Sequence, residues 1–231
     1  MPIDKPANIA LLIDADNASP DDLENVLSIL AELGAVNVRR AYGNWSKPAL
    51  KGWAAMTHRH ALDPQQQFDV TKGKNATDMK MAIDAMDYLH GGQVHGFGLM
   101  SSDSDFMPLA MRIRQSGLPV YGFGTTKTPE SFRQACTRFI NVEKLKSEDA
   151  PAAKKPAVDA DMIALLGEAI KASKRDDRGF ASLSEVGRRA SARSSFDTRN
   201  YGFTRLTDLV ESLPNFQTEK RENGVFVKRV N

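Results

Sequence analysis

Five aspartates in three short segments are the residues of this chain whose types and spacing best suit chemistry. They are Asp14 and Asp16 in NIALLIDADN, Asp78 in KGKNATDMK, and Asp103 and Asp105 in GLMSSDSDF. Carboxylates that gather at one place repel one another unless they share a cation or a proton. A hard divalent cation with oxygen ligands, Mg²⁺ or Mn²⁺, is the simplest resolution. The pattern predicts a metal-dependent site, since such an ion can activate a water molecule and orient a phosphodiester.

Each of these aspartates also has a purely structural explanation. An aspartate after a strand often caps the next helix, and one in a first helical turn favours the helix dipole. We prefer a shared metal site because two strand ends carry acids and Asp78 adds a third segment. Asp84 lies six positions after Asp78, on a different side of the helix. We expect it behind the site or at the surface, paired with Lys80.

The acids must be positioned by a series of alternating strands and helices. The apolar runs Ile9–Ile13 and Val94–Met100 predict buried strands that end just before acidic segments, and Thr77–Leu89 predicts a helix. This alternation predicts an α/β fold with a parallel sheet and helices on both faces, whose site lies at the carboxyl edge. The other elements expected in this part are strands at 36–41, 68–71, 118–123 and 139–142, and helices at about 19–33, 48–60 and 106–115.

Basic and aromatic residues near the acids are candidates for contact with a polyanion. Lys72 and Lys74 precede Asp78, where they either contact a nucleic-acid backbone or form part of a solvated loop. Arg40 and Trp45 belong to a group at the end of the second strand that can bind phosphates and stack on bases, although Trp45 suits the core equally well. The full group is Arg39, Arg40, Tyr42, Trp45 and Lys47.

A change in composition divides the chain. Residues 147–160, SEDAPAAKKPAVDA, are rich in Ala, Pro and charge, which predicts a linker between a domain at 1–146 and a second at 161–231. The second domain has 13 Lys and Arg against 10 Asp and Glu, a small excess that favours an anionic partner. Helical patterns at 162–172, 183–190 and 203–213, followed by a ribbon that turns at Asn223-Gly224, predict a small winged-helix domain.

The bulk properties are those of a cytoplasmic protein. The amino terminus lacks a secretory pattern, and no apolar run approaches the roughly 20 residues that span a membrane, so we expect no membrane partner. Cys136 is the one cysteine, which excludes an internal disulfide. Its helical neighbours suggest a buried structural thiol rather than a nucleophile.

The first part of the chain resembles the NYN domain family, a branch of the PIN-like ribonuclease fold. The resemblance rests on LLIDADN, RRAYGNW, KGKNATDMKMAIDAM and GLMSSDSDFMPLAMRIRQSGLPVYGFG, and covers residues 8 to about 142. It implies a metal-dependent nuclease that acts on RNA. It also implies that Asp14, Asp78, Asp103 and Asp105 are the catalytic, metal-holding cluster, and that Asn17 faces the substrate.

The last part of the chain resembles the LOTUS domain, also called OST-HTH. The resemblance rests on FASLSEVGRRA, RNYGFTRLTDLVES and FQTEKRENGVFVKRV, within about 162–230. It implies binding of RNA or of a protein partner. Charge for an RNA contact would come from Arg188, Arg189, Arg193, Arg199 and Arg205.

Three functions are compatible with these patterns. The favoured one is metal-dependent hydrolysis of RNA phosphodiester bonds, with the second domain binding RNA or a partner protein. The alternative is a non-catalytic RNA-binding or adaptor protein that retains a PIN-like shell. A third interpretation takes Asp14 and Asp16 as the nucleophile loop of a haloacid-dehalogenase-like phosphatase. That family needs a hydroxyl group two positions after the second aspartate, where this chain has Ala18.

Overall fold

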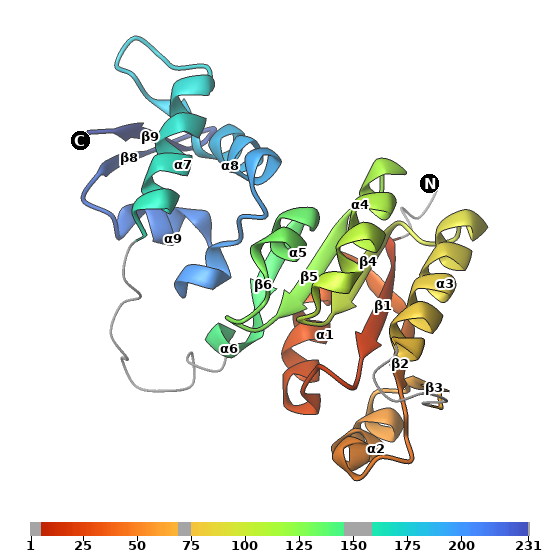
Figure 1. The fold of residues 1–231 in the computed structure, drawn as a ribbon. Coiled ribbons are helices and arrows are strands. Elements are labelled where there is room, and N and C mark those ends of the chain that lie inside the picture. The colour runs from red at the N-terminus through yellow and green to blue at the C-terminus, as the bar shows by residue number, and fades with distance from the viewer. Residues whose placement is uncertain (1–5, 69–74, 146–158, 231) are drawn as a thin grey trace. The chain divides into compact units, whose positions relative to one another are not determined.

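A six-stranded parallel sheet forms the framework of the first of two units into which the chain divides, Met1–Val142 and Glu143–Asn231 (Figure 1). The computed structural model describes residues 6–68, 75–145 and 159–230. The strand order is β3-β2-β1-β4-β5-β6, and every neighbouring pair is parallel. The strands are β1 (Asn8–Asp14), β2 (Ala35–Gly43), β3 (Asp63–Gln66), β4 (Gly96–Met100), β5 (Val120–Gly124) and β6 (Arg138–Asn141).

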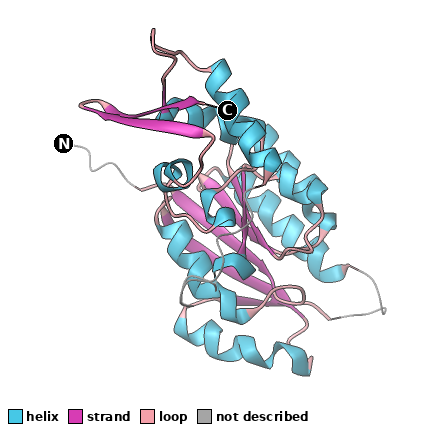
Figure 2. Ribbon diagram, turned by 90° about the vertical axis from the view of Figure 1, so that its left-hand side faces the viewer, coloured by secondary structure: helices cyan, strands magenta, loops and turns pink. Residues whose placement is uncertain are grey.

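Helices connect these strands and cover both faces of the sheet. Figure 2 shows the helices in cyan on either side of the magenta strands. This confirms the predicted α/β class. The strand order reverses between β1 and β4, so the connections that leave these two neighbours diverge and open a crevice at their carboxyl ends. The helices are η1 (Pro20–Asp22), α1 (Leu23–Ala31), η2 (Pro48–Leu50), α2 (Lys51–Arg59), α3 (Ala76–Gly91), η3 (Ser104–Phe106), α4 (Met107–Gln115), α5 (Glu130–Ala135) and α6 (Val142–Leu145).

The side chains of β1 alternate between two cores. Ala10 and Leu12 pack in a core with residues of α3 and α4. On the other face, Gly98 of β4 lets α1 approach, because a Cβ there would lie 2.9 Å from Cδ1 of Leu30. Asp14 continues the alternation of Ala10 and Leu12, and therefore points to the side of the sheet that α3 and α4 cover. A buried strand thus delivers a carboxylate to the end of the crevice.

The edge strand β3 differs from the sequence prediction. It lies at Asp63–Gln66, whereas the sequence placed a strand at 68–71. Phe68 is 64% exposed and lies outside any strand, and residues 69–71 lie outside the described residues. The sequence DPQQ has no apolar alternation, since an edge strand can remain polar and can include a proline.

The second unit joins helices to a three-stranded antiparallel sheet of order β7-β9-β8. Its core contains Leu166, Val186, Leu209 and Val227, which are at most 1% exposed. The helices and the hairpin confirm the predicted winged helix, and the short strand β7 is an addition to it. The elements are α7 (Ala160–Ala172), β7 (Ala181–Ser182), α8 (Leu183–Arg193), η5 (Thr198–Tyr201), α9 (Leu206–Glu211), β8 (Phe216–Arg221) and β9 (Gly224–Arg229).

The third helix of this unit begins later than the sequence predicted. Gly202 has a φ of 76°, a left-handed conformation that ends η5 and separates it from α9. Residues 203–205 follow this turn outside any helix, and α9 begins at Leu206. Throughout the described ranges, no helix is both long and apolar enough to cross a membrane.

Candidate metal centre at the carboxyl edge of the sheet

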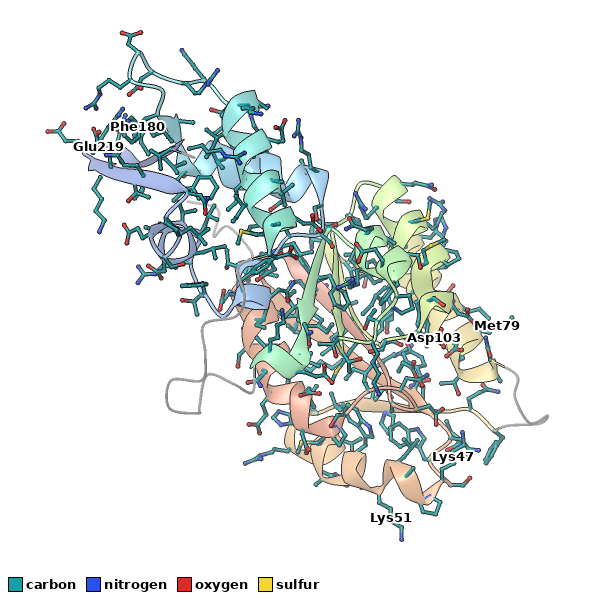
Figure 3. The ribbon with its side chains drawn as sticks, turned by 60° about the vertical axis from the view of Figure 1, so that its left-hand side comes forward. Lys47, Lys51, Met79, Asp103, Phe180 and Glu219 are labelled. Carbon is teal, nitrogen blue, oxygen red and sulfur yellow. The ribbon has the colours of Figure 1, made fainter. Side chains whose placement is uncertain are left out.

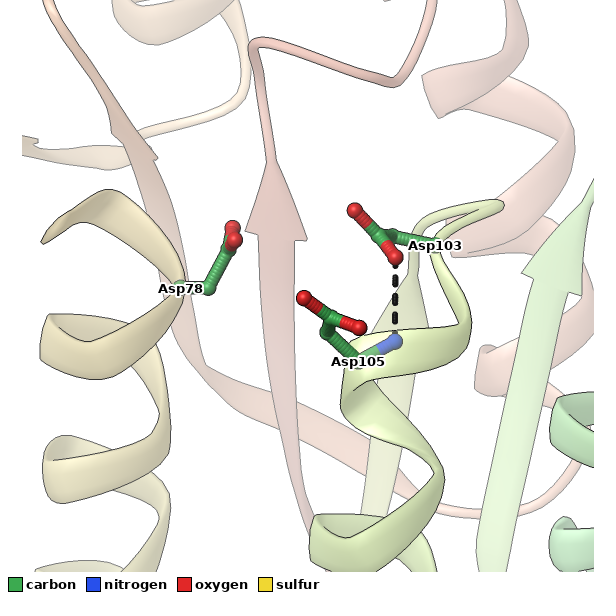
Figure 4. A group of neighbouring side chains, drawn as sticks. All are labelled: Asp78, Asp103 and Asp105. Carbon is green, nitrogen blue, oxygen red and sulfur yellow. Dashed lines mark hydrogen bonds between the residues drawn. The ribbon is translucent and has the colours of Figure 1, made fainter. Parts of the chain in front are cut away.

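Three of the predicted acids meet at the carboxyl edge of the parallel sheet. Asp78 belongs to the first turn of α3, Asp103 to the loop after β4, and Asp105 to η3. One carboxylate oxygen of each lies within 4.8 Å of the others. Figure 4 shows the Asp78 carboxylate directed from α3 toward the pair that precedes α4. These separations allow one cation, with its bound waters, to contact all three side chains.

Asp103 caps a helical turn and faces the cluster at once. Its side chain accepts a hydrogen bond from the backbone N–H of Asp105 at 2.9 Å, which fixes the start of η3. A carboxylate has two oxygens with several lone pairs, so the cap leaves acceptor capacity for a cation. The structural and the metal-binding explanations of Asp103 are therefore compatible.

Asp14 lies beside this group and is fully buried. Its Oδ2 accepts hydrogen bonds from Nδ2 of Asn17 at 2.9 Å and from Oγ of Ser101 at 2.8 Å. Its Oδ1 is buried and has no hydrogen-bond partner within the described part of the chain. Burial raises the pKa of Asp14, and the bonds from Asn17 and Ser101 oppose that rise. A buried, unpaired carboxylate oxygen next to other carboxylates fits a hard divalent cation.

The charges of these acids act on one another. The pKa of Asp78 rises to about 6, first because the side chain is partly buried and then because other carboxylates surround it. Asp14 contributes most among those neighbours, followed by Asp103, Asp105 and Asp16. The four predicted ligands thus share one electrostatic environment, and a bound cation would favour the ionised form of Asp78.

Uncharged residues that the sequence reasoning missed hold the acids in place. Ser101 donates to Asp14, and its Oγ also accepts the backbone N–H of Asp103 at 3.1 Å. Asn75, the residue before α3, donates through Nδ2 to Oδ2 of Asp105. A serine within SSDSD and an asparagine in a loop have no spacing that marks them. Only their position next to the acids could have drawn attention to them.

Asp16 is engaged on the rim of the cluster rather than within it. Lys47 forms an ion pair with it at 3.2 Å, and Oγ1 of Thr77 lies 3.3 Å from its Oδ2. Thr77 is buried and precedes Asp78 in α3. Asp16 therefore links the segment after β1 to the helix that carries Asp78.

An ion pair between the partly exposed Arg40 and the buried Asp84 links β2 to α3. Asp84 is 4% exposed and accepts hydrogen bonds from Nη1 of Arg40 at 2.9 Å, from the hydroxyl of Tyr42 at 3.0 Å, and from Lys80. Arg40 also bonds to Asp63 at 2.9 Å, which joins β2 to β3. The charge of Arg40 is thus committed to two carboxylates of the fold. The expected pairing of Asp84 with Lys80 is present, and Asp84 lies in the interior.

The other residues expected to contact substrate differ in their positions. Asn17 is exposed and hydrogen-bonded to Asp14, so it lies at the cluster. Trp45 is half-buried, and its backbone N–H donates to Oε1 of Gln66 at 3.0 Å. Lys72 and Lys74 lie outside the described residues.

Two hollows adjoin the acids. One, of about 420 Å³, is lined by residues at the ends of β1, β4 and β5, among them the polar Asn17, Ser102 and Thr125. The other, of about 400 Å³, lies between α3 and α4 and is lined by Asp78 and Asp105 together with apolar side chains. Met79, labelled near Asp103 in Figure 3, belongs to this second hollow and is 65% exposed. The site is therefore open to a ligand that extends beyond the acids.

Family models match both parts of the chain. The family model described as NYN domain matches residues 8–143, and the model described as OST-HTH/LOTUS domain matches residues 154–227. No curated protein is significantly similar to the chain in sequence.

Two solved structures show weaker likeness. A protein of unknown function from Vibrio parahaemolyticus is 20% identical, with a TM-score of 0.49, over 61% of this chain and 96% of its own. A carbohydrate transporter from Acidothermus cellulolyticus, in complex with myo-inositol, is 12% identical, with a TM-score of 0.30, over 82% and 52%. With TM-scores below 0.5, neither structure bears on the site.

Proposed function

Because the chain belongs to the NYN domain family, we propose that it is a metal-dependent ribonuclease that hydrolyses RNA phosphodiester bonds. The convergence of Asp78, Asp103 and Asp105 from separate segments, beside the buried Asp14, is the observation that carries this proposal. Carboxylates this close repel one another, and a divalent cation bound between them would offset that repulsion.

In this proposal Asp14, Asp78, Asp103 and Asp105 would hold Mg²⁺ or Mn²⁺. When bound, such an ion supplies an activated water molecule and stabilises charge on the leaving oxygen. Hydrogen bonds from neighbouring side chains hold the acids in position: Ser101 and Asn17 orient Asp14, and Asn75 orients Asp105. This orientation matters because partners of metal ligands fix ligand geometry and basicity.

The proposed substrate is an RNA strand that extends from the acids into one or both adjoining hollows. Asn17 and Ser102 offer hydrogen bonds on one side, and Met79 offers an apolar surface for a base on the other. Lys72, Lys74, Arg40 and Trp45 stay predicted substrate contacts.

We propose a division of labour between the domains at 1–146 and 161–231, joined by a linker at 147–160. The first carries the catalytic site, and the second, which contains the OST-HTH/LOTUS match, recruits RNA or a partner protein. We also keep the cytoplasm as the proposed compartment.

A cleavage assay with labelled single-stranded and structured RNA tests the proposal. Wild-type protein is incubated with Mg²⁺, with Mn²⁺ and with EDTA, beside Asp14→Asn, Asp103→Asn and Asp87→Asn. Asp87 is an exposed acid of α3 and serves as the matched control. We expect metal-dependent cleavage by the wild type and the control, and none by the two site variants.

The outcome also separates the alternatives. Cleavage that persists in EDTA or in Asp103→Asn would contradict a metal site at these acids. RNA binding by wild type and variants, without cleavage in either metal, would favour the non-catalytic RNA-binding or adaptor protein.

A further inference from the structure

A groove between α7 and β9 brings together five basic residues of the second unit. It has a volume of about 420 Å³, and its lining includes five basic residues and no acidic residue. We refer to it as the α7–β9 groove. Its lining residues are Gly167, Ile170, Lys171, Arg175, Arg178, Gly179, Lys228, Arg229 and Val230.

Two glycines give this groove its form. At Gly167 in α7, a Cβ would lie 2.4 Å from Nη1 of Arg229, so the missing side chain lets the guanidinium lie against the helix. Gly179 has a φ of 83°, and this left-handed turn carries Arg178 to the rim of the groove. Backbone geometry at these glycines therefore contributes to the positions of Arg229 and Arg178.

The cations of the groove outnumber the acids next to them. Lys171 pairs with Glu168 at 2.8 Å, and Arg178 pairs with Glu219 at 2.6 Å. Arg175 and Lys228 form no ion pair with any residue that the structure describes. The groove therefore holds at least two cations, Arg175 and Lys228, whose charge no described acid pairs with.

An aromatic ring, rather than an acid, supports Lys228. Its Nζ lies 4.7 Å from the ring centroid of Phe180, which is 3% exposed, and Cζ of Arg178 lies 5.5 Å from the same centroid. Figure 3 labels Phe180 beside Glu219. A cation held over a ring keeps its full charge, so it can still neutralise an anionic ligand.

Of the five arginines that the sequence suggested for RNA contact, three lie outside the groove next to an acid. Arg189 pairs with Glu185 at 2.8 Å, and Arg205 pairs with Asp208 at 3.3 Å. Arg199 lies 3.4 Å from the buried Asp197. Cations next to an acid contribute little to the attraction of a polyanion. Arg188 and Arg193 form no ion pair within the described residues, but the groove gathers its basic side chains in one hollow without an acid, which makes it the stronger candidate.

We propose that the α7–β9 groove binds phosphates of the RNA backbone, with Arg175 and Lys228 as the principal contacts. The proposal rests on RNA as the ligand of the proposed function, but not on cleavage. A protein partner is disfavoured because interfaces between proteins centre on exposed aromatic and apolar residues. In this groove Ile170 is 3% exposed, no aromatic residue lines the surface, and Val230, 45% exposed, is the one exposed aliphatic side chain among the lining residues.

Fluorescence anisotropy of a fluorescein-labelled single-stranded RNA tests this site in the full chain. EDTA prevents metal-dependent cleavage, and the titration is repeated from 50 to 300 mM KCl. Wild type is compared with Arg175→Gln/Lys228→Gln and with Arg188→Gln/Arg205→Gln, which removes the same charge outside the groove. We expect the groove variant to raise Kd by about tenfold or more, and to reduce the salt slope by about 1.4, at about 0.7 per lost phosphate contact.

Gly167→Ala is a second variant that keeps every charge. The added methyl group displaces the Arg229 guanidinium, the end of a flexible side chain, so the fold is retained and circular dichroism checks this. We expect weaker RNA binding, smaller in effect than for the double variant.

Three results would overturn the groove. They are an unchanged Kd and salt slope in Arg175→Gln/Lys228→Gln, an equal loss in Arg188→Gln/Arg205→Gln, and an absence of RNA binding by the wild type in EDTA. Failure of the proposed nuclease would be distinct, because it is a lack of cleavage in Mg²⁺ or Mn²⁺ by protein that still binds RNA.

Discussion

The acidic edge of the first unit and the basic groove of the second are opposite in sign but alike in design. In each, side chains of the same charge lie close together, and the described residues supply too few opposite charges to pair with all of them. At the acidic edge, the evidence is the raised pKa of Asp78. In the basic groove, the evidence is that Arg175 and Lys228 form no ion pair with a described residue. Asp84 provides the contrast, since three side chains satisfy its buried carboxylate. Charge that the fold leaves unsatisfied indicates a ligand, whereas charge that it satisfies indicates structure.

The largest effect expected within this comparison is the loss of cleavage in Asp78→Asn. The cleavage rate should fall by more than about 100-fold, since changing a residue that only supports a metal ligand already costs roughly 10- to 100-fold. RNA binding in EDTA should be unchanged, because the groove lies in the other unit. A single-turnover assay beside Asp87→Asn measures this, and a rate within threefold of wild type would remove Asp78 from the site.

Ser101→Ala should have the next largest effect. Its hydroxyl joins Asp14 to the backbone of Asp103, so its loss loosens two acids without removing a charge. We expect cleavage and Mn²⁺ affinity to fall by roughly 10- to 100-fold. Ser104→Ala, in the same segment but outside both hollows, is the control for a general change in the segment. Equal activity of the two variants would mean that the Ser101 bonds are not needed.

Arg40→Ala tests the satisfied acid. It removes one of three donors from the buried Asp84, and the free energy of unfolding should fall by about 1–3 kcal/mol in urea titrations. Arg59→Ala breaks an exposed pair with Glu24 and should cost at most about 1 kcal/mol. A raised KM for RNA with unchanged stability would instead place Arg40 on the substrate, as the sequence predicted.

The smallest effect is a pH dependence of stability in EDTA. The pKa of Asp78 is about 6 in the folded chain and near its ordinary value of 3.8 when unfolded. The folded state therefore binds the Asp78 proton more tightly than the unfolded state does. The contribution of Asp78 to the free energy of unfolding consequently falls as pH rises from about 4 to 6. Asp78→Asn should be more stable than wild type at pH 6.5, by more than at pH 4.5. Parallel pH profiles of the two proteins would show that Asp78 is not crowded.

Much of the fold and the acidic cluster could be predicted from the sequence because both depend on local patterns. Ile9–Ile13 and Val94–Met100 are apolar runs, and parallel strands place their carboxyl ends at one edge. Strand β3 could not be predicted, because the polar segment DPQQ has no strand pattern. The α7–β9 groove could not be predicted either. Its Arg175 and Lys228 come from distant segments and become neighbours only when β9 packs beside α7.

The most direct test of the account is single-turnover cleavage of one RNA over a range of protein concentrations in Mn²⁺. The acids are expected to set the rate at saturation, and the groove is expected to set the concentration needed to reach it. Asp103→Asn should lose the saturated rate, whereas Arg175→Gln/Lys228→Gln should retain it and require roughly tenfold more protein. The reverse pattern, or a saturated rate that survives Asp103→Asn, would contradict the account.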